Sequence, residues 1–353
     1  MISDSKRCAP PTTVVTGDMH YWDVWHNFKP IEAFREFYYR FCSEYGFESL
    51  PDIKTCRAFA DETKGDFDLC SPVMAAHQKC VQGNEKIMYY LAQMVRYPYD
   101  FKQLIYSSQL VQADCIRSNV EHMRRARGRC MGSAYWQVND SNPVISWSSI
   151  DYFGRWKGLP YSAKRFYAPC LISCDDTHRK KPVLNISNER MTAFEGIVRW
   201  KLRNNKAEIL QSGEKSVSVP ALTAQNVLTI DLSDELKNRT DPREKYLEYS
   251  IMENGKELSF GTTLFVRPKE FTFLEPAITY GISESEDKFA LTFCAENYAK
   301  SVCLSLKTAD CVFSDNWFDI HGKEPVTIMI DKASLSRKMT AQELSEELEI
   351  MHN

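Results

Sequence analysis

Residues 40–49 read R-F-C-S-E-Y-G-F-E-S, and the charged residue Glu44 sits inside this largely apolar and aromatic run. Apolar runs of this length are typical of buried strands. Burying a carboxylate is costly unless the group is paired, neutralised or used in chemistry. An isolated glutamate in such a run is more often a salt-bridged residue than a catalytic one. This stretch alone therefore leaves the role of Glu44 open.

The segments that follow this run predict a parallel α/β unit. Residues 73–95 and 101–127 look helical, and in the second the apolar side chains recur at three- and four-residue spacing. The next run, C-M-G-S-A-Y-W-Q-V from residue 130, is short and mostly apolar, which suits a strand buried on both faces. A strand, a long helix and a second strand in this order are typical of parallel sheets.

The pattern changes near residue 169 to short alternating runs, which predict antiparallel β-structure. The clearest runs are V-L-N-I-S (183–187), I-V-R-W-K-L (197–202), K-Y-L-E-Y-S-I (245–251) and L-S-F-G-T-T-L-F-V (258–266). Tight-turn signals lie between them, such as Asn254-Gly255. A break at R-P-K-E (267–270) precedes a second β-rich region, in which T-A-Q-E (340–343) is a capping box. We therefore expect three domains, at residues 1–168, 169–267 and 268–353.

Composition excludes several classes of function. The 353 residues carry a net charge of -3, so no field favours nucleic acid. No apolar run approaches the roughly 18 residues that cross a bilayer, and the N-terminal M-I-S-D-S-K-R lacks the apolar core of a signal peptide. The twelve cysteines include no C-x-x-C pair, so we expect free thiols in a cytoplasmic protein. Walker A and G-x-G-x-x-G motifs are absent, and we expect no cofactor.

Three stretches could carry chemistry: G-D-M-H-Y-W-D-V-W-H (17–26), residues 40–49, and Y-W-Q-V-N-D with the Trp-rich residues after it (135–157). In barrels of parallel strands, polar groups at the carboxyl ends of strands line the active site. A carboxylate beside Trp faces suits a carbohydrate, because the ring packs the apolar side of a sugar. The tryptophans could instead be core residues. His20 and His26, with Asp18 and Asp23 nearby, match no zinc spacing, so we expect no metal.

Taken together, these stretches resemble the β-mannosidases of glycoside hydrolase family 2. Residues 17–26 look like the loop before the seventh barrel strand, residues 40–49 like the nucleophile strand, and residues 135–157 like the eighth strand and the exit from the barrel. V-F-S-D-N-W-F-D-I-H-G-K-E (312–324) resembles the C-terminal immunoglobulin-like domain. The resemblance implies an α/β and all-β fold: the last two strands of a (β/α)8 barrel, followed by two immunoglobulin-like β-sandwiches.

The resemblance also implies a retaining exo-glycosidase that removes terminal β-D-mannose from mannosides or manno-oligosaccharides. By motif position Glu44 would be the nucleophile, and Trp22 and Trp136 would flank the terminal sugar. Trp25 and His26 would lie nearby. The family commonly has Gln where this chain has Glu48. A second carboxylate facing Glu44 would raise its pKa.

One part of the family pattern is not found in this sequence. The acid/base Glu of the family follows an Asn at the end of the fourth barrel strand, and no Asn-Glu pair precedes residue 44 here. We therefore expect a C-terminal fragment that is inactive alone. A separate chain that supplies the N-terminal half is one open partner. The alternatives are a non-catalytic β-sandwich module that binds carbohydrate or a partner protein, and a degenerate fragment.

Overall fold

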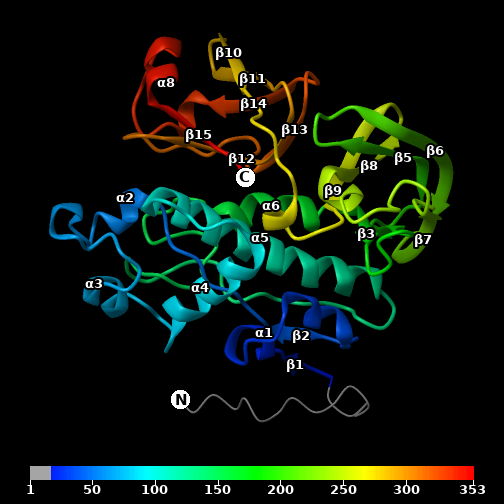
Figure 1. The fold of residues 1–353 in the computed structure, drawn as a ribbon, viewed down its shortest axis with the longest axis horizontal. Helices are drawn as coiled ribbons and strands as arrows, with labels where there is room; N and C mark the ends of the chain where they lie inside the picture. The colour runs from blue at the N-terminus through cyan, green and yellow to red at the C-terminus, as the bar shows by residue number, and fades with distance from the viewer. Residues whose placement is uncertain (1–16) are drawn as a thin grey trace.

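The computed structural model describes residues 17–353, which form a helical part and two β-sandwich units (Figure 1). The stretch on which the expectation of no signal peptide rests lies outside the described residues. Within residues 17–353, no helix has both the length and the apolar character that crossing a membrane requires. In Figure 1 the helical part lies below, one sandwich to the right and the C-terminal sandwich above.

The helical part surrounds a small group of parallel segments. Its elements are β1 (Met19–His20), α1 (Asp23–His26), η1 (Ile31–Glu36), β2 (Cys42–Glu44), α2 (Ile53–Cys56), η2 (Glu62–Lys64), α3 (Pro72–Ala76), α4 (Gly83–Met94), α5 (Phe101–Arg125) and α6 (Gly158–Phe166). The expected helix at 101–127 is confirmed as α5, whose first turn is capped by the Asp100 side chain accepting from the backbone of Gln103.

The helix expected at 73–95 is interrupted, because its middle residues pair with another segment. The backbone of Ile145 donates to His77 and accepts from Lys79, at 2.9 and 3.1 Å. These bonds hold residues 77–79 in an extended path between α3 and α4. The sequence period alone cannot reveal a pairing between segments nearly seventy residues apart.

Three parallel segments lie side by side at the base of the helical part. β1 pairs with β2, so that His20 lies opposite Glu44. The other edge of β2 pairs with residues 131–136 through parallel bridges, Cys42 to Ser133 and Gly46 to Trp136. The expectation that residues 17–26 form a loop was wrong for Met19 and His20, which form β1, and for Asp23–His26, which form α1. Two residues are too few for an alternating pattern to show in the sequence.

The middle unit is an antiparallel sandwich, as expected. One sheet has the order β3-β4-β7 and the other β6-β5-β8-β9. The strands are β3 (Cys170–Asp175), β4 (Val183–Asn188), β5 (Phe194–Asn204), β6 (Ile209–Val219), β7 (Thr223–Thr229), β8 (Lys245–Glu253) and β9 (Lys256–Leu264), with α7 (Asp241–Glu244) before β8. Asn254 and Gly255 both have positive φ, at 53° and 77°, which is the backbone of the predicted tight turn.

The C-terminal unit is a second, smaller sandwich with sheets β10-β11-β14 and β13-β12-β15. Its elements are η3 (Pro268–Glu270), β10 (Thr279–Glu284), β11 (Lys288–Cys294), β12 (Tyr298–Leu306), β13 (Phe318–His321), β14 (Val326–Asp331), η4 (Lys332–Ser334), α8 (Ala341–Glu347) and β15 (Leu348–Met351). The predicted capping box is confirmed at the start of α8, where Thr340 and Glu343 exchange both hydrogen bonds.

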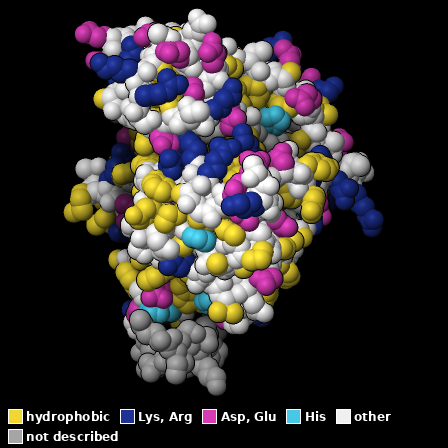
Figure 2. All heavy atoms as spheres, turned by 90° about the vertical axis from the view of Figure 1, so that its left-hand side faces the viewer, with side chains coloured by type: hydrophobic (Ala, Val, Ile, Leu, Met, Phe, Trp, Pro, Cys, Tyr) yellow, Lys and Arg dark blue, Asp and Glu magenta, His cyan; other side chains and the backbone are white. Residues whose placement is uncertain are grey.

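The C-terminal sandwich shares its hydrophobic core with the helical part, whereas the middle sandwich has a core of its own. Trp317 stacks on Tyr106 of α5, with ring centroids 4.8 Å apart. Figure 2 shows Lys and Arg side chains gathered in a band between these two parts. Lys54 and Arg155 bind Asp310 of the C-terminal unit there, at 2.6 and 2.8 Å. The two parts are therefore joined by both apolar packing and ion pairs.

Candidate active site

Glu44 is the last residue of β2, and its carboxylate is held through one oxygen. The indole nitrogen of Trp22 donates to Oε2 at 3.2 Å, and Nδ1 of His20 lies 3.3 Å from the same oxygen. The other oxygen, Oε1, has no hydrogen-bond partner within residues 17–353. About a third of the side chain is exposed. This carboxylate is therefore oriented by its neighbours and still open to a ligand.

His20 reaches Glu44 because β1 and β2 run parallel with these two residues in register. The other ring nitrogen of His20 lies 3.9 Å from Asp18. Asp18 is itself fixed by Ser43, whose hydroxyl donates at 2.6 Å and whose backbone donates at 3.1 Å. Slight burial raises the pKa of Asp18, but the hydrogen bonds from Ser43 and Met19 outweigh it and lower the pKa below its usual value. An imidazole thus bridges two carboxylates.

Tryptophans gather on the segments next to β2, and one of them, Trp22, contacts the Glu44 carboxylate. Trp22 meets Trp147 edge to face, with centroids 6.0 Å apart. Trp136 is 44% exposed and hangs from the third parallel segment, where its backbone donates to Tyr45 at 2.7 Å. The half-buried Trp22 and the exposed Trp136 both lie on segments beside β2, so the structure brings together three of the predicted site residues.

Gly46 makes this close arrangement of rings possible. A Cβ atom at this position would stand 2.5 Å from the carbonyl oxygen of Trp136, 2.9 Å from the ring of Trp22 and 3.0 Å from that of Trp147. Real Cβ atoms do not approach other atoms so closely. Any larger residue would push the walls of the site apart.

Trp25 and His26 lie on α1, directly after Trp22, and they differ in exposure. Trp25 is fully buried, with its indole nitrogen 3.4 Å from the sulfur of Cys80. It packs against Phe47 and presents no face to a ligand, contrary to its predicted place at the sugar. His26 is half-buried and packs on Trp22 at 5.2 Å. Burial and the charge of Lys86 lower the pKa of His26, which favours the neutral imidazole.

Glu48 does not face Glu44 but points into the interior. It is fully buried, and neither of its oxygens has a hydrogen-bond partner in the described part of the chain. Burial raises the pKa of Glu48 well above its usual value, against the opposing charges of Lys157 and Lys86. Lys157 is also buried and binds the backbone of Ser49 at 3.1 Å, and burial lowers its pKa to about 8. The predicted influence of Glu48 on Glu44 therefore has no basis in contact.

Several residues of the site were not predicted from the sequence. His20 and Asp18 were weighed only as metal ligands, and Trp147 was not singled out. The pairing of β1 with β2 makes His20 a partner of Glu44. The alternation of Asp18 and His20 just before the tryptophans was the available signal for a short strand, but the sequence does not show that this strand pairs with β2.

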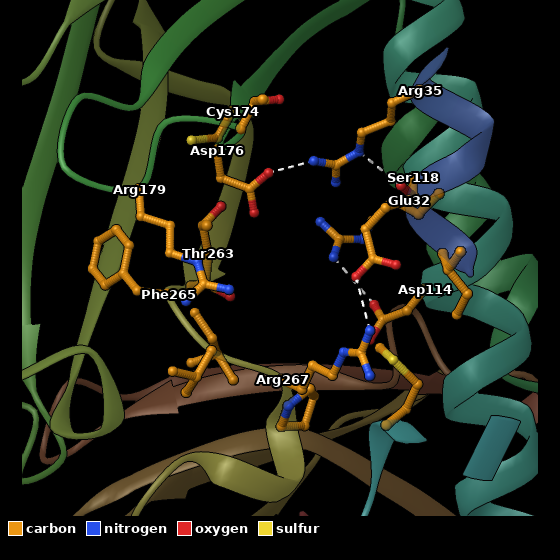
Figure 3. A pocket seen from close by; sticks show the side chains of 18 of the residues that line it. Glu32, Arg35, Asp114, Ser118, Cys174, Asp176, Arg179, Thr263, Phe265 and Arg267 are labelled. Atoms are coloured by element: carbon orange, nitrogen blue, oxygen red, sulfur yellow. Dashed lines mark hydrogen bonds and ion pairs between the residues drawn. The ribbon is translucent and has the colours of Figure 1, made fainter. Parts of the chain in front are cut away.

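A separate cavity of about 690 Å³ lies where the helical part meets the middle sandwich (Figure 3). It is lined by charged side chains from η1, α5 and the segments that follow β3 and β9. Two ion pairs cross it, Arg35 with Asp176 and Arg267 with Glu32. Neither Glu44 nor the tryptophans line this cavity. It is an ion-paired junction between domains rather than the site of Glu44.

Comparison with known proteins shows which proteins this chain is similar to. Residues 181–270 match the family model described as the mannosidase Ig/CBM-like domain, and residues 273–353 match a mannosidase Ig-fold domain. Beta-mannosidase B of Thermothelomyces thermophilus is 25% identical over 93% of this chain and 42% of its own length. This chain is similar to the C-terminal part of β-mannosidases. The resemblance drawn from the sequence is thus confirmed.

Other β-mannosidases support the same relationship. The β-mannosidase of Capra hircus is 33% identical over 44% of this chain and 19% of its own length. The solved structure of the β-D-mannosidase from Dictyoglomus thermophilum shares the fold over 96% of this chain and 40% of its own, with a TM-score of 0.85 and 24% identity. The exo-chitosanase of Amycolatopsis orientalis also shares the fold, with a TM-score of 0.70 and 16% identity over 92% of this chain and 44% of its own. The chain spans about 40% of the length of the relatives that match most of it.

Proposed function

We propose that these residues carry the nucleophile half of a retaining exo-β-mannosidase site. The substrate is a β-mannoside or a manno-oligosaccharide, and the product is the terminal β-D-mannose. The observation that carries the proposal is the Glu44 carboxylate at the end of β2, held through Oε2 with Oε1 open. The β-mannosidase relatives supply the chemistry that such a carboxylate would serve.

The arrangement of parallel segments supports a barrel origin for the helical part. β1, β2 and residues 131–136 are adjacent and parallel, as three consecutive strands of a (β/α)8 barrel would be. Phe41, Met131 and Val138 lie on or beside these segments and are 41%, 65% and 58% exposed. We propose that further barrel strands, outside these 353 residues, cover this apolar surface. The remnant would then comprise three strands, rather than the two expected from the sequence.

The mechanism that follows assigns a role to each residue at the site. Oε1 of Glu44 attacks the anomeric carbon while the leaving oxygen accepts a proton from a second carboxyl group. Water, activated by that same group, then releases mannose and regenerates the Glu44 carboxylate. Trp22 fixes Oε2, and the exposed face of Trp136 packs on the sugar ring. His26 borders the sugar as a neutral imidazole, and Trp25 supports the wall from behind.

The second carboxyl group has to stand about 5–5.5 Å from Glu44 for this mechanism. The hydrogen-bond and ion-pair partners of the Glu44 carboxylate within residues 17–353 are an indole and an imidazole. We therefore propose that the acid/base comes from polypeptide outside these residues, either joined to them or supplied by a separate N-terminal chain. The 353 residues alone would be inactive, and the assembled enzyme would act in the cytoplasm.

Complementation tests this proposal directly. The full chain is co-expressed with the N-terminal three-fifths of a related β-mannosidase, and hydrolysis of an aryl β-mannoside is measured. We expect activity only when both chains are present. Glu44→Gln should abolish that activity, by at least about 10³-fold, because the nucleophile is lost. Asp23→Asn, a change on the neighbouring α1, is the control that should leave it. An inactive but correctly assembled pair would contradict the proposal.

Covalent labelling gives a second readout that does not need turnover. A 2-fluoro-mannosyl fluoride forms a long-lived ester with a retaining nucleophile because the second step is slowed. We expect one mannosyl adduct per assembled pair, and peptide mapping should place it on Glu44. An adduct on any other carboxylate would remove Glu44 from the role of nucleophile.

A further inference from the structure

An aromatic groove lies between the C-terminal end of α4 and the N-terminal end of α5. It encloses about 510 Å³, which is within the usual range for sites that bind small ligands. Its floor is apolar and includes the buried Leu91 and Val95. Phe67 and Phe101 stack beside this floor with centroids 4.8 Å apart. The groove is thus a preformed hollow whose shape is fixed by core residues.

Two tyrosines project from the rim of this groove into solvent. Tyr97 is 77% exposed and Tyr99 is 87% exposed, and their rings meet edge to face at 6.5 Å. Exposed aromatic side chains cost free energy in water, because their faces are left uncovered. The two rings therefore offer uncovered faces next to a preformed hollow.

Carboxylates at the rim are oriented in a way that leaves acceptors free. Oδ1 of Asp68 accepts from the backbone of Cys70 at 2.9 Å, and Oδ1 of Asp100 accepts from the backbone of Gln103 at 2.8 Å. The second oxygen of each carboxylate has no partner in the described residues. Neither aspartate forms an ion pair within residues 17–353. Each free oxygen can accept a hydrogen bond from a hydroxyl group.

We propose that this groove is a second carbohydrate-binding site, separate from Glu44. Aromatic faces pack on the C–H side of a pyranose ring, while fixed carboxylates accept hydrogen bonds from its hydroxyls. The groove provides both kinds of group and no unpaired cluster of positive charge that would favour an anion. The occupant is a stretch of manno-oligosaccharide, and this choice of sugar rests on the proposed function. The site would hold a polymeric substrate on the protein between cleavage events.

Calorimetric titration of the full chain with β-1,4-linked mannotriose tests the proposal. We expect binding to weaken about ten-fold or more in the double variant Tyr97→Ala/Tyr99→Ala, because two stacking faces are lost. Tyr97→Phe/Tyr99→Phe should keep most of the affinity, because it keeps the rings. The control Tyr152→Ala removes another exposed tyrosine, 47% exposed and outside the groove, and should change nothing.

A further variant separates this site from the one at Glu44. Trp136→Ala should leave binding in the groove intact, so the result does not depend on whether the chain takes part in catalysis. Failure of the complementation assay alone would leave the groove proposal standing. Absence of binding to wild type, or equal binding to the double alanine variant, would overturn it. Concentration-dependent dimers that dissociate in that variant would also overturn it, because the groove would then bind a second copy.

Discussion

The buried Glu48 allows the sharpest test of the structure. The substitution Glu48→Gln keeps the size of the side chain and removes its ability to ionise. Neither oxygen of Glu48 has a hydrogen-bond partner by geometry in the described residues, and burial raises its pKa, which favours the neutral acid. In the unfolded chain the same group ionises with a pKa near 4.3. Above this pH, folding of the wild type therefore requires Glu48 to take up a proton, whereas folding of the variant does not.

The size of the effect follows from proton linkage. Burial raises the pKa of Glu48 in the folded state, so the folded protein binds more protons than the unfolded chain above pH 4.3, and wild-type stability falls as pH rises. In this range each pH unit lowers the wild-type free energy of unfolding by about 1.4 kcal/mol. As long as the folded carboxyl stays protonated, the free energy of unfolding of Glu48→Gln should rise by roughly 2–3 kcal/mol relative to wild type between pH 5 and pH 7. The gain ends where the folded carboxyl itself ionises.

Denaturant unfolding at pH 5, 6, 7 and 8 measures this difference, because titrations common to both proteins cancel. Infrared spectroscopy supplies an independent readout, since the carbonyl stretch of a protonated carboxyl should disappear in the variant. If Glu48 is ionised and paired with Lys157 or Lys86, removing its charge should destabilise the protein by about 3–5 kcal/mol at pH 7. A flat or falling difference with pH would refute the neutral carboxyl.

Three other substitutions test separate parts of the structure. Gly46→Ala should lower the free energy of unfolding by about 1–3 kcal/mol, because the added Cβ would stand 2.5 Å from the carbonyl oxygen of Trp136. The same clash should lower labelling of the assembled enzyme by the mannosyl fluoride at least ten-fold. Unchanged labelling would contradict this geometry. Asp310→Asn should lower the free energy of unfolding at pH 7 by about 1 kcal/mol, since the partly exposed carboxylate binds Arg155 through two hydrogen bonds. Partial burial raises the pKa of Asp310, but its bonds to Arg155 and Lys54 outweigh this and lower the pKa. The difference should therefore be lost as pH falls below about 4. Trp317→Ala should lower the free energy of unfolding by about 3–5 kcal/mol. In urea unfolding, the transitions of the helical part and of the C-terminal sandwich should shift together. A shift in one part alone would argue against a shared core.

The β-sandwiches could be predicted from the sequence because each strand carries its own signal. Alternation of apolar and polar residues is local, and so is the turn at Asn254 and Gly255. The parallel segments of the helical part carry no such signal. β1 has two residues, and residues 131–136 form only isolated bridges to β2. Their arrangement depends on pairing across long stretches of chain, which a single sequence does not encode in any readable period.

In the candidate site too, residues marked by local features of the sequence were predictable, and residues placed by strand pairing were not. Glu44 and Trp22 could be found, because a carboxylate in an apolar run and a Trp-rich stretch are both local features. The role of His20 could not, since it comes from the register of two short strands. Trp22 and Trp25 are three residues apart, and the sequence cannot tell which of them faces the core. Burial decides this, and it places Trp25 inside.

The shared core of the helical part and the C-terminal sandwich has a consequence for synthesis of the chain on the ribosome. The helical part ends near residue 166, and the buried apolar side chains that complete its core come from residues 289–348. At 5–20 residues per second, the 187 residues from 167 to 353 take roughly 10 to 40 s to synthesise. Throughout that time the apolar surface of the helical part stays exposed to solvent. Nascent chains should therefore engage chaperones until the last strand is released, and premature stop codons even near the C-terminus should send the protein to degradation.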